Sequence, residues 1–190
     1  MNKLAILHEG NEKKTHDNEL IVMLIQHLGF DEKKVNFYGM RSKSNFYKVN
    51  CPEYRSFKES IEIGLVEKVL FILDADSNKN DAIYGGYDNT LKTIRAIIQQ
   101  LAIENLSQIY IMCDPETKEG YLESLILATI PDDRKCCIED FLKCSHFESK
   151  ENHKAILHSI YKIAYPQAPY HFAHHYFDDL KQKLIWLFTP

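Results

Sequence analysis

The chain has 190 residues, of which 45% are hydrophobic and 26% are charged, and its net charge is −4 at pH 7. This composition is typical of a soluble globular domain with one sizeable core, and no apolar run approaches the ~20 residues of a membrane helix. The acidic balance excludes nucleic-acid binding by bulk positive charge, so any such binding needs a local patch or a metal ion.

The first residues give no sign of export. The apolar part of residues 1–9 is too short for a signal peptide, and no small-residue cleavage site follows it. We therefore expect a cytoplasmic protein without a membrane association, whose five cysteines are thiols. Cys136, Cys137 and Cys144 lack the paired spacing of a structural zinc site.

The first 130 residues alternate between strand and helix patterns. Branched and aromatic apolar runs predict strands at residues 3–8, 35–38, 69–73 and 108–113. Apolar residues at helical spacing predict helices at 20–28, 53–64, 91–101 and 122–130, with Gly29 ending the first and Asp88 capping the third. Residues 39–52 read as a long irregular segment. This alternation predicts an α/β fold with a mostly parallel sheet covered by helices.

The last third of the chain is predicted to be helical, at residues 138–144, 152–165 and 172–188. No linker or internal repeat separates it from the rest. We therefore expect a single domain, 1–190, in which 131–190 form a helical extension packed on the α/β core of 1–130.

A basic segment lies between residues 33 and 58, with seven basic residues against Glu53 alone. Aromatic residues are interleaved with it, and cations with rings are typical of a single-strand-binding surface. The candidate nucleic-acid-binding residues are Arg41, Lys43, Lys48 and Arg55. In the alternative interpretation the aromatic side chains fold back onto the core and the lysines are merely solvated.

Carboxylates follow the predicted strands. Glu9 follows the first strand, Asp74 and Asp76 follow a strand buried on both faces, and Asp114 follows the last. In a parallel sheet these ends share one edge, where Glu9 and Asp74 become neighbours if their strands pair. In an extended chain Asp74 and Asp76 point to the same side and reach one cation. An Asp-x-Asp after a strand is otherwise ordinary turn and cap chemistry.

Hard oxygen ligands of this kind suit Mg²⁺ or Mn²⁺. Glu123 lies in the first turn of a predicted helix, where the helix dipole favours a carboxylate, and it faces the same sheet edge. Acids from four distant parts of the chain, converging there, would repel one another unless a cation neutralised them.

These motifs resemble the Toprim domain. The resemblance rests on Glu9-Gly10 after the first strand, Asp74-Ala75-Asp76 after a later one, and Gly120-Tyr121-Leu122-Glu123 before a helix. Toprim is the Mg²⁺-binding fold of type IA and type II topoisomerases, bacterial primases and overcoming-lysogenization-defect (OLD) nucleases. The sequence is most similar to a small stand-alone Toprim-like family whose members end in helices and a Trp-x-x-Phe-like tail, here Trp186-Leu187-Phe188.

The resemblance implies residue roles. Glu9 would be the general acid/base, Asp74 and Asp76 would hold Mg²⁺, and Glu123 would complete a metal shell. Lys154 would be a catalytic residue near the acids, as a lysine is in OLD nucleases; in the alternative interpretation it is a surface lysine. Toprim sequences commonly carry an acid four residues after the Glu of Glu-Gly, where this chain has Lys13. Glu12 or Asp17 would then take over that role.

The expected function is Mg²⁺- or Mn²⁺-dependent phosphodiester hydrolysis of DNA or RNA, because nuclease is the Toprim activity that 190 residues could house alone. The alternative is a non-catalytic Toprim-like component of a defence or toxin system, partnered with an ATPase or another protein. A receiver-like domain also clusters acids at strand ends, but it would need an acidic pair after the first strand, where only Glu9 stands.

Three histidines near the C-terminus form one further candidate metal site. His171, His174 and His175 have i, i+3, i+4 spacing, which would place them on one face of the predicted helix 172–188. The neighbouring Tyr170 and Phe172 point instead to partly buried aromatic surroundings.

Overall fold

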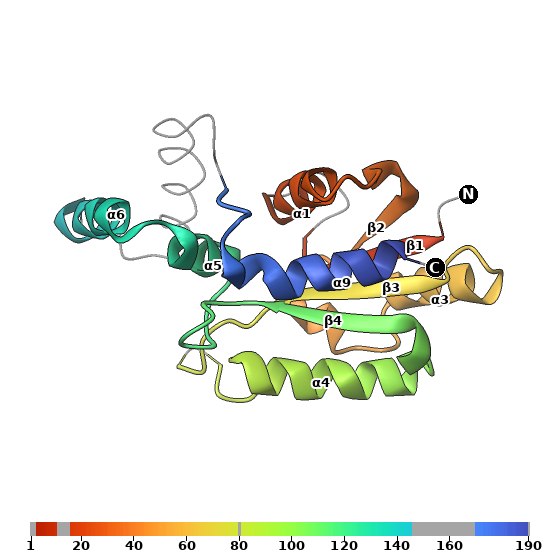
Figure 1. Ribbon diagram of the computed structural model, residues 1–190. Helices are drawn as coiled ribbons and strands as arrows, with labels where there is room; N and C mark the ends of the chain where they lie inside the picture. Colours follow the sequence, from red (N-terminus) through yellow and green to blue (C-terminus); the bar gives the residue numbers. More distant parts are fainter. Residues whose placement is uncertain (1–2, 11–15, 80, 146–169, 190) are drawn as a thin grey trace.

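A computed structural model describes residues 3–10, 16–79, 81–145 and 170–189. Within these residues, parallel strands form a single sheet in the order β2-β1-β3-β4 (Figure 1). The strands are β1 (Leu4–His8), β2 (Val35–Gly39), β3 (Lys68–Asp74) and β4 (Ser107–Met112). The predicted α/β class is therefore confirmed.

Helices cover both faces of the sheet. The α-helices are α1 (His16–His27), α2 (Lys43–Phe46), α3 (Pro52–Glu62), α4 (Tyr87–Gln100), α5 (Leu122–Thr129), α6 (Asp132–Ser145) and α9 (Asp178–Phe188). Short 3-10 helices are η1 (Glu32–Lys34), η2 (Glu104–Leu106) and η4 (His175–Phe177). None of the described helices is long and apolar enough to span a bilayer.

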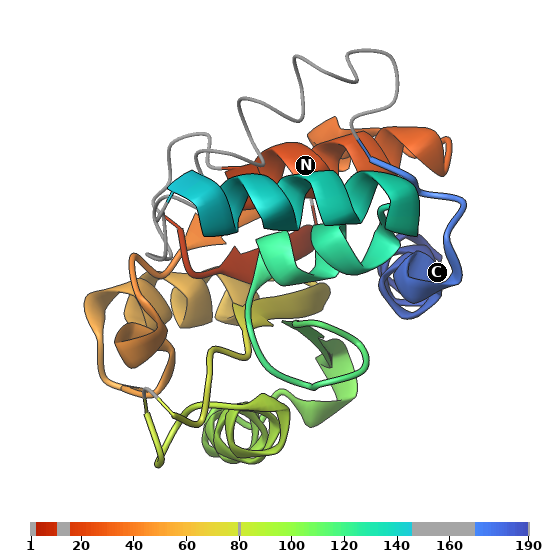
Figure 2. The same cartoon turned by 90° about the vertical axis from the view of Figure 1, so that its left-hand side faces the viewer.

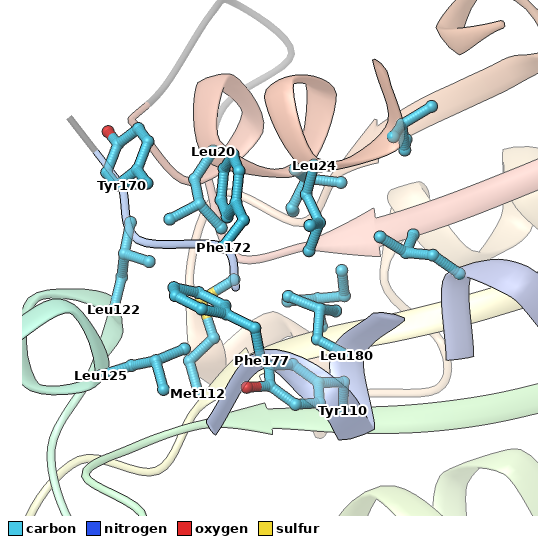
Figure 3. Close-up of a cluster of buried hydrophobic side chains, with 14 of the residues drawn as sticks. Leu20, Leu24, Tyr110, Met112, Leu122, Leu125, Tyr170, Phe172, Phe177 and Leu180 are labelled. Carbon is cyan, nitrogen blue, oxygen red and sulfur yellow. The ribbon is translucent and has the colours of Figure 1, made fainter. Parts of the chain in front are cut away.

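Side chains of the central strand β3 pack into two hydrophobic clusters. Leu70 and Ile72 face a cluster that includes α1, α5 and α9, while Phe71 and Leu73 face another built with α2, α3 and α4. Figure 3 shows the first cluster, in which Phe177 and Leu180 lie on the same face of the sheet as Leu20 and Leu24 of α1. Alternate side chains bury on opposite faces, which explains the continuous apolar run.

The C-terminal helix belongs to this core. Leu180, Leu184 and Leu187 of α9 are fully buried in the same cluster as Leu70 of β3. At about 25 cal/mol per Å² of apolar surface, each buried leucine contributes on the order of 2 kcal/mol against the unfolded chain. The predicted helical C-terminal region is thus part of the α/β packing.

Several predicted element boundaries were wrong. The irregular segment 39–52 contains the short helix α2, and α3 begins at Pro52, whose fixed φ suits a first helical position. Gly86, not Asp88, is the N-cap of α4. The last helix begins at Asp178 after the 3-10 turn η4, six residues later than predicted. The predicted helix 152–165 lies outside the described residues.

Candidate functional site

The candidate site lies where β1 and β3 end. These strands pair in parallel with His8 opposite Ile72, so Glu9 follows β1 beside the last residues of β3. The main-chain N–H of Asp74 donates a hydrogen bond to Oε1 of Glu9 at 2.9 Å. The predicted proximity of Glu9 and Asp74, 65 residues apart in the chain, is confirmed by this bond.

Asp76 has a backbone conformation that the sequence did not reveal. Its φ is 58°, in the left-handed region, and β3 has already ended at Asp74. Its N–H and C=O both pair with the main chain of Gly120, at 2.6 and 2.9 Å. Because the chain turns here, the extended relation predicted for the carboxylates of Asp74 and Asp76 does not hold. Aspartate tolerates this conformation better than most residues.

Lys43 brings a positive charge to this edge. Its Nζ lies 3.1 Å from Oδ2 of Asp76 and donates to the carbonyl of Ala75 at 2.7 Å. Only 13% of the Lys43 side chain is exposed. Figure 2 looks onto the carboxyl ends of the strands and shows α2 beside the loop after β3. Lys43 was predicted to bind nucleic acid, but its ammonium group is engaged by Asp76.

Glu123 is buried near this edge of the sheet. It lies in the first turn of α5, is 2% exposed, and follows Gly120 by three residues. Within the described ranges, no three His, Cys, Asp or Glu side chains are placed to hold one metal ion. The predicted convergence of acids on one cation is therefore not found within these ranges, and the Asp76 carboxylate is directed to Lys43.

This donor set still fits a hard cation. Mg²⁺ is usually held by one or two carboxylates together with substrate phosphates and water, and not by a complete protein cage. The Glu9 carboxylate lies against the main chain of Asp74, which carries a second carboxylate at the end of β3, and the ammonium group on Asp76 indicates that this edge favours positive charge. Asp114 is different, since its Oδ1 accepts the N–H groups of Glu116 and Thr117 and stabilises a local turn.

His8 anchors the turn that carries Glu9. It is 1% exposed, and burial lowers its pKa to about 4, so the ring is neutral at pH 7. Nδ1 accepts the N–H of Gly10 at 3.2 Å, and Nε2 lies 3.2 Å from the side-chain amide of Asn18. The atom of Asn18 that faces Nε2 is the side-chain nitrogen Nδ2, so the contact ties the His8 ring to α1.

The basic segment divides into buried rings and exposed cations. Phe46, Tyr54 and Phe57 are at most 1% exposed, so for these rings the interpretation as core residues is correct. Arg41 is exposed and pairs with Glu53 at 3.3 Å. Lys48 and Arg55 are exposed.

Tyr47 stays half-buried and stacks on Tyr84, with ring centroids 4.9 Å apart and an angle of 28°. These rings and Lys43, Lys48 and Asp76 line a pocket of about 300 Å³. Sequence reasoning missed the Tyr47–Tyr84 pair, because 37 residues separate two tyrosines that carry no shared motif.

Models of known families, curated proteins and solved structures gave no match to this chain. The Toprim resemblance thus rests on the motif residues alone.

Some predicted site residues fall outside the description. Lys154, Glu12 and Lys13 lie outside the described residues, and so does the side chain of Asp17.

The histidines near the C-terminus do not share one helix face. His174 caps η4, and its Nδ1 accepts the N–H of Tyr176 at 3.2 Å. A neutral ring with this bond carries its proton on Nε2, which opposes metal binding by that nitrogen. Burial and the neighbouring His175 and His171 lower the pKa of His174.

The described cysteines 51, 113, 136, 137 and 144 are free thiols.

Proposed function

We propose that this chain is a Mg²⁺- or Mn²⁺-dependent phosphodiesterase acting on DNA or RNA, a Toprim-like nuclease. The observation that carries the proposal is the 2.9 Å hydrogen bond from the N–H of Asp74 to Oε1 of Glu9. This bond brings the Glu9 carboxylate to the main chain of Asp74, and in α/β folds ligands collect at this edge of the sheet, which supports the proposal.

The roles follow from position. Glu9 is half-buried at the end of β1 and moves a proton to or from the reacting oxygens, while Asp74 beside it provides a carboxylate ligand. A divalent cation held there would polarise the phosphodiester as a Lewis acid. Asp76 is positioned by Lys43 and, through its main chain, connects the site to the start of α5.

The first test compares nucleic-acid cleavage by the purified chain and by conservative variants. Glu9→Gln and Asp74→Asn remove a charge without changing side-chain size, and each should lower cleavage by about 10² or more. Exposed acids away from this edge provide the controls: Glu62→Gln at the end of α3 and Glu104→Gln before β4 should retain activity.

Substrates are single- and double-stranded DNA and RNA, with Mg²⁺, Mn²⁺ or a chelator. Cleavage that persists in Glu9→Gln at the wild-type rate would show a contaminating nuclease. If the wild-type protein cleaves none of the four substrates with either metal, the proposal fails.

A second candidate is favoured by the Lys43–Asp76 ion pair. Because Lys43 already neutralises Asp76 and is mostly buried, this edge has a cation of its own. Such a site suits a non-catalytic Toprim-like component that works by binding another protein, such as an ATPase. Titration calorimetry separates the candidates: no Mn²⁺ binding at millimolar concentration, together with no cleavage, favours the binding component.

A further inference from the structure

The pocket beside Asp76 is built from two segments distant in the chain. Tyr47 and Lys48 follow α2, and Asp81 and Tyr84 belong to the loop between β3 and α4. The Tyr47 and Tyr84 rings stack, and Tyr84 remains 42% exposed. A flat aromatic surface is therefore held rigidly by a partner ring while part of it faces solvent.

This pocket adjoins the candidate carboxylates. Lys43 and Asp76 belong to its lining and to the sheet edge alike. Burial raises the pKa of Tyr47, and the nearby charges of Glu9, Asp76 and Asp81 raise it further. Tyr47 is thus a neutral phenol in the pocket lining, close enough to Glu9 for that charge to affect its pKa.

Only some of the charged side chains that line the pocket can bind a ligand. Lys43 is engaged by Asp76, and Oδ1 of Asp81 accepts the N–H groups of Ile83 and Tyr84 at 3.0 Å each, which fixes the loop that presents Tyr84. Lys48 is exposed, and no acid within the described part of the chain pairs with it. Lys48 is therefore the cation of this pocket that can bind an anionic ligand.

We propose that this pocket, lined by Tyr47, Tyr84 and Lys48, binds one nucleotide of single-stranded nucleic acid beside the Glu9–Asp74 edge. The base stacks on the exposed part of Tyr84, and a phosphate contacts Lys48. This inference rests on the proposed function and adds its substrate class. A base can stack on a protein ring only when it is released from a duplex, and a pocket of about 300 Å³ is at the small end of ligand sites.

The test measures binding without catalysis. Fluorescence anisotropy with labelled oligonucleotides of about twelve nucleotides, single-stranded DNA in one arm and RNA in the other, is recorded in a chelator. Tyr84→Ala should weaken binding about tenfold, and Tyr84→Phe should retain it. Lys48→Gln should weaken binding and lower the salt dependence by about one counterion.

Two neighbours provide matched controls. Ile83→Ala alters an exposed residue, 71% accessible, in the same loop but outside the pocket lining. Lys58→Gln removes an exposed lysine of α3 that is also outside it. Both should bind like the wild type, and thermal melting confirms that each variant is folded.

The inference is overturned if the wild type binds neither single strand, or if Tyr84→Ala and Lys48→Gln bind as tightly as Ile83→Ala and Lys58→Gln. A different result would show that the nuclease proposal alone is wrong. In that case binding depends on Tyr84 and Lys48, but Mg²⁺ and Mn²⁺ produce no cleavage. If cleavage is lost in Glu9→Gln but unchanged in Tyr84→Ala and Lys48→Gln, the nuclease proposal holds and the proposed role of the pocket is wrong.

Discussion

The ammonium group of Lys43 neutralises the carboxylate of Asp76. It contacts both the Asp76 carboxylate and the carbonyl of Ala75, and it is largely removed from water. A lysine in this place offsets the repulsion among acids at the strand ends. It also competes with any divalent cation for Asp76.

Replacing Lys43 by methionine should separate these effects. Lys43→Met keeps the length of the side chain and should lower the free energy of unfolding by about 2 kcal/mol, because charged hydrogen bonds are lost. Millimolar Mn²⁺ should then raise the melting temperature more in the variant than in the wild type, since a ligand of the folded state stabilises it. Equal Mn²⁺-dependent shifts would contradict competition for Asp76.

His8 should make stability depend on pH. Its pKa is about 4 when folded and near 6.5 when unfolded, so the unfolded chain binds more protons between these values. The contribution of His8 to the free energy of unfolding is therefore complete above pH 6.5. It falls by up to about 3 kcal/mol as the pH drops through 4.

Urea unfolding at several pH values measures this effect, with His8→Asn as the comparison. The difference between wild type and variant isolates His8 from the carboxylates that also titrate at acidic pH. Parallel pH profiles for the two proteins would exclude this role of His8.

At the scale of elements, the strand ends were more predictable than the loops. The apolar run 69–73 is buried on both faces, as its pattern predicts. Parallel pairing of β1 with β3 then brings Glu9 beside Asp74. The turn at Asp76 depends on main-chain bonds to Gly120, 44 residues away, which no local pattern encodes. Similarly, nothing in the basic segment distinguishes Lys43, which pairs with Asp76, from the exposed Lys48.

The loop between β3 and α4 should tolerate no side chain at Gly85. A Cβ there would lie 2.4 Å from the carbonyl oxygens of Ser77 and Asp81. Gly85→Ala should therefore displace Tyr84 and weaken oligonucleotide binding about tenfold, as Tyr84→Ala does. Gly29→Ala is the control: its φ of +78° is strained for alanine, but the space is open, so it should cost about 1 kcal/mol and leave binding intact. Equal binding by both variants would contradict this account of the loop.

At the scale of the whole molecule, the C-terminal helix shares its core with the sheet. Leu184 is fully buried among residues of α1 and β3, whereas its neighbour Ile185 is 43% exposed. The helical pattern of the tail could be predicted from sequence. Its packing against β3 and β4 could not, because an amphipathic face does not specify which surface it covers.

Leu184→Ala should lower the free energy of unfolding by about 3 kcal/mol, through lost burial and the cavity left behind. Ile185→Ala, one residue later, should change it by no more than about 0.5 kcal/mol. Chemical denaturation followed by tryptophan fluorescence and circular dichroism should give one common transition. Two transitions, with only one affected by Leu184→Ala, would mean that α9 folds separately from the sheet.

The central claim is that Glu9 and Asp74 form a cation site at the sheet edge. An anomalous-difference map from crystals soaked in Mn²⁺ tests it most directly. The account predicts a peak between the carboxylates of Glu9 and Asp74 that is lost in Asp74→Asn crystals. A map with no peak at this edge, or with Mn²⁺ bound only elsewhere on the protein, would contradict it.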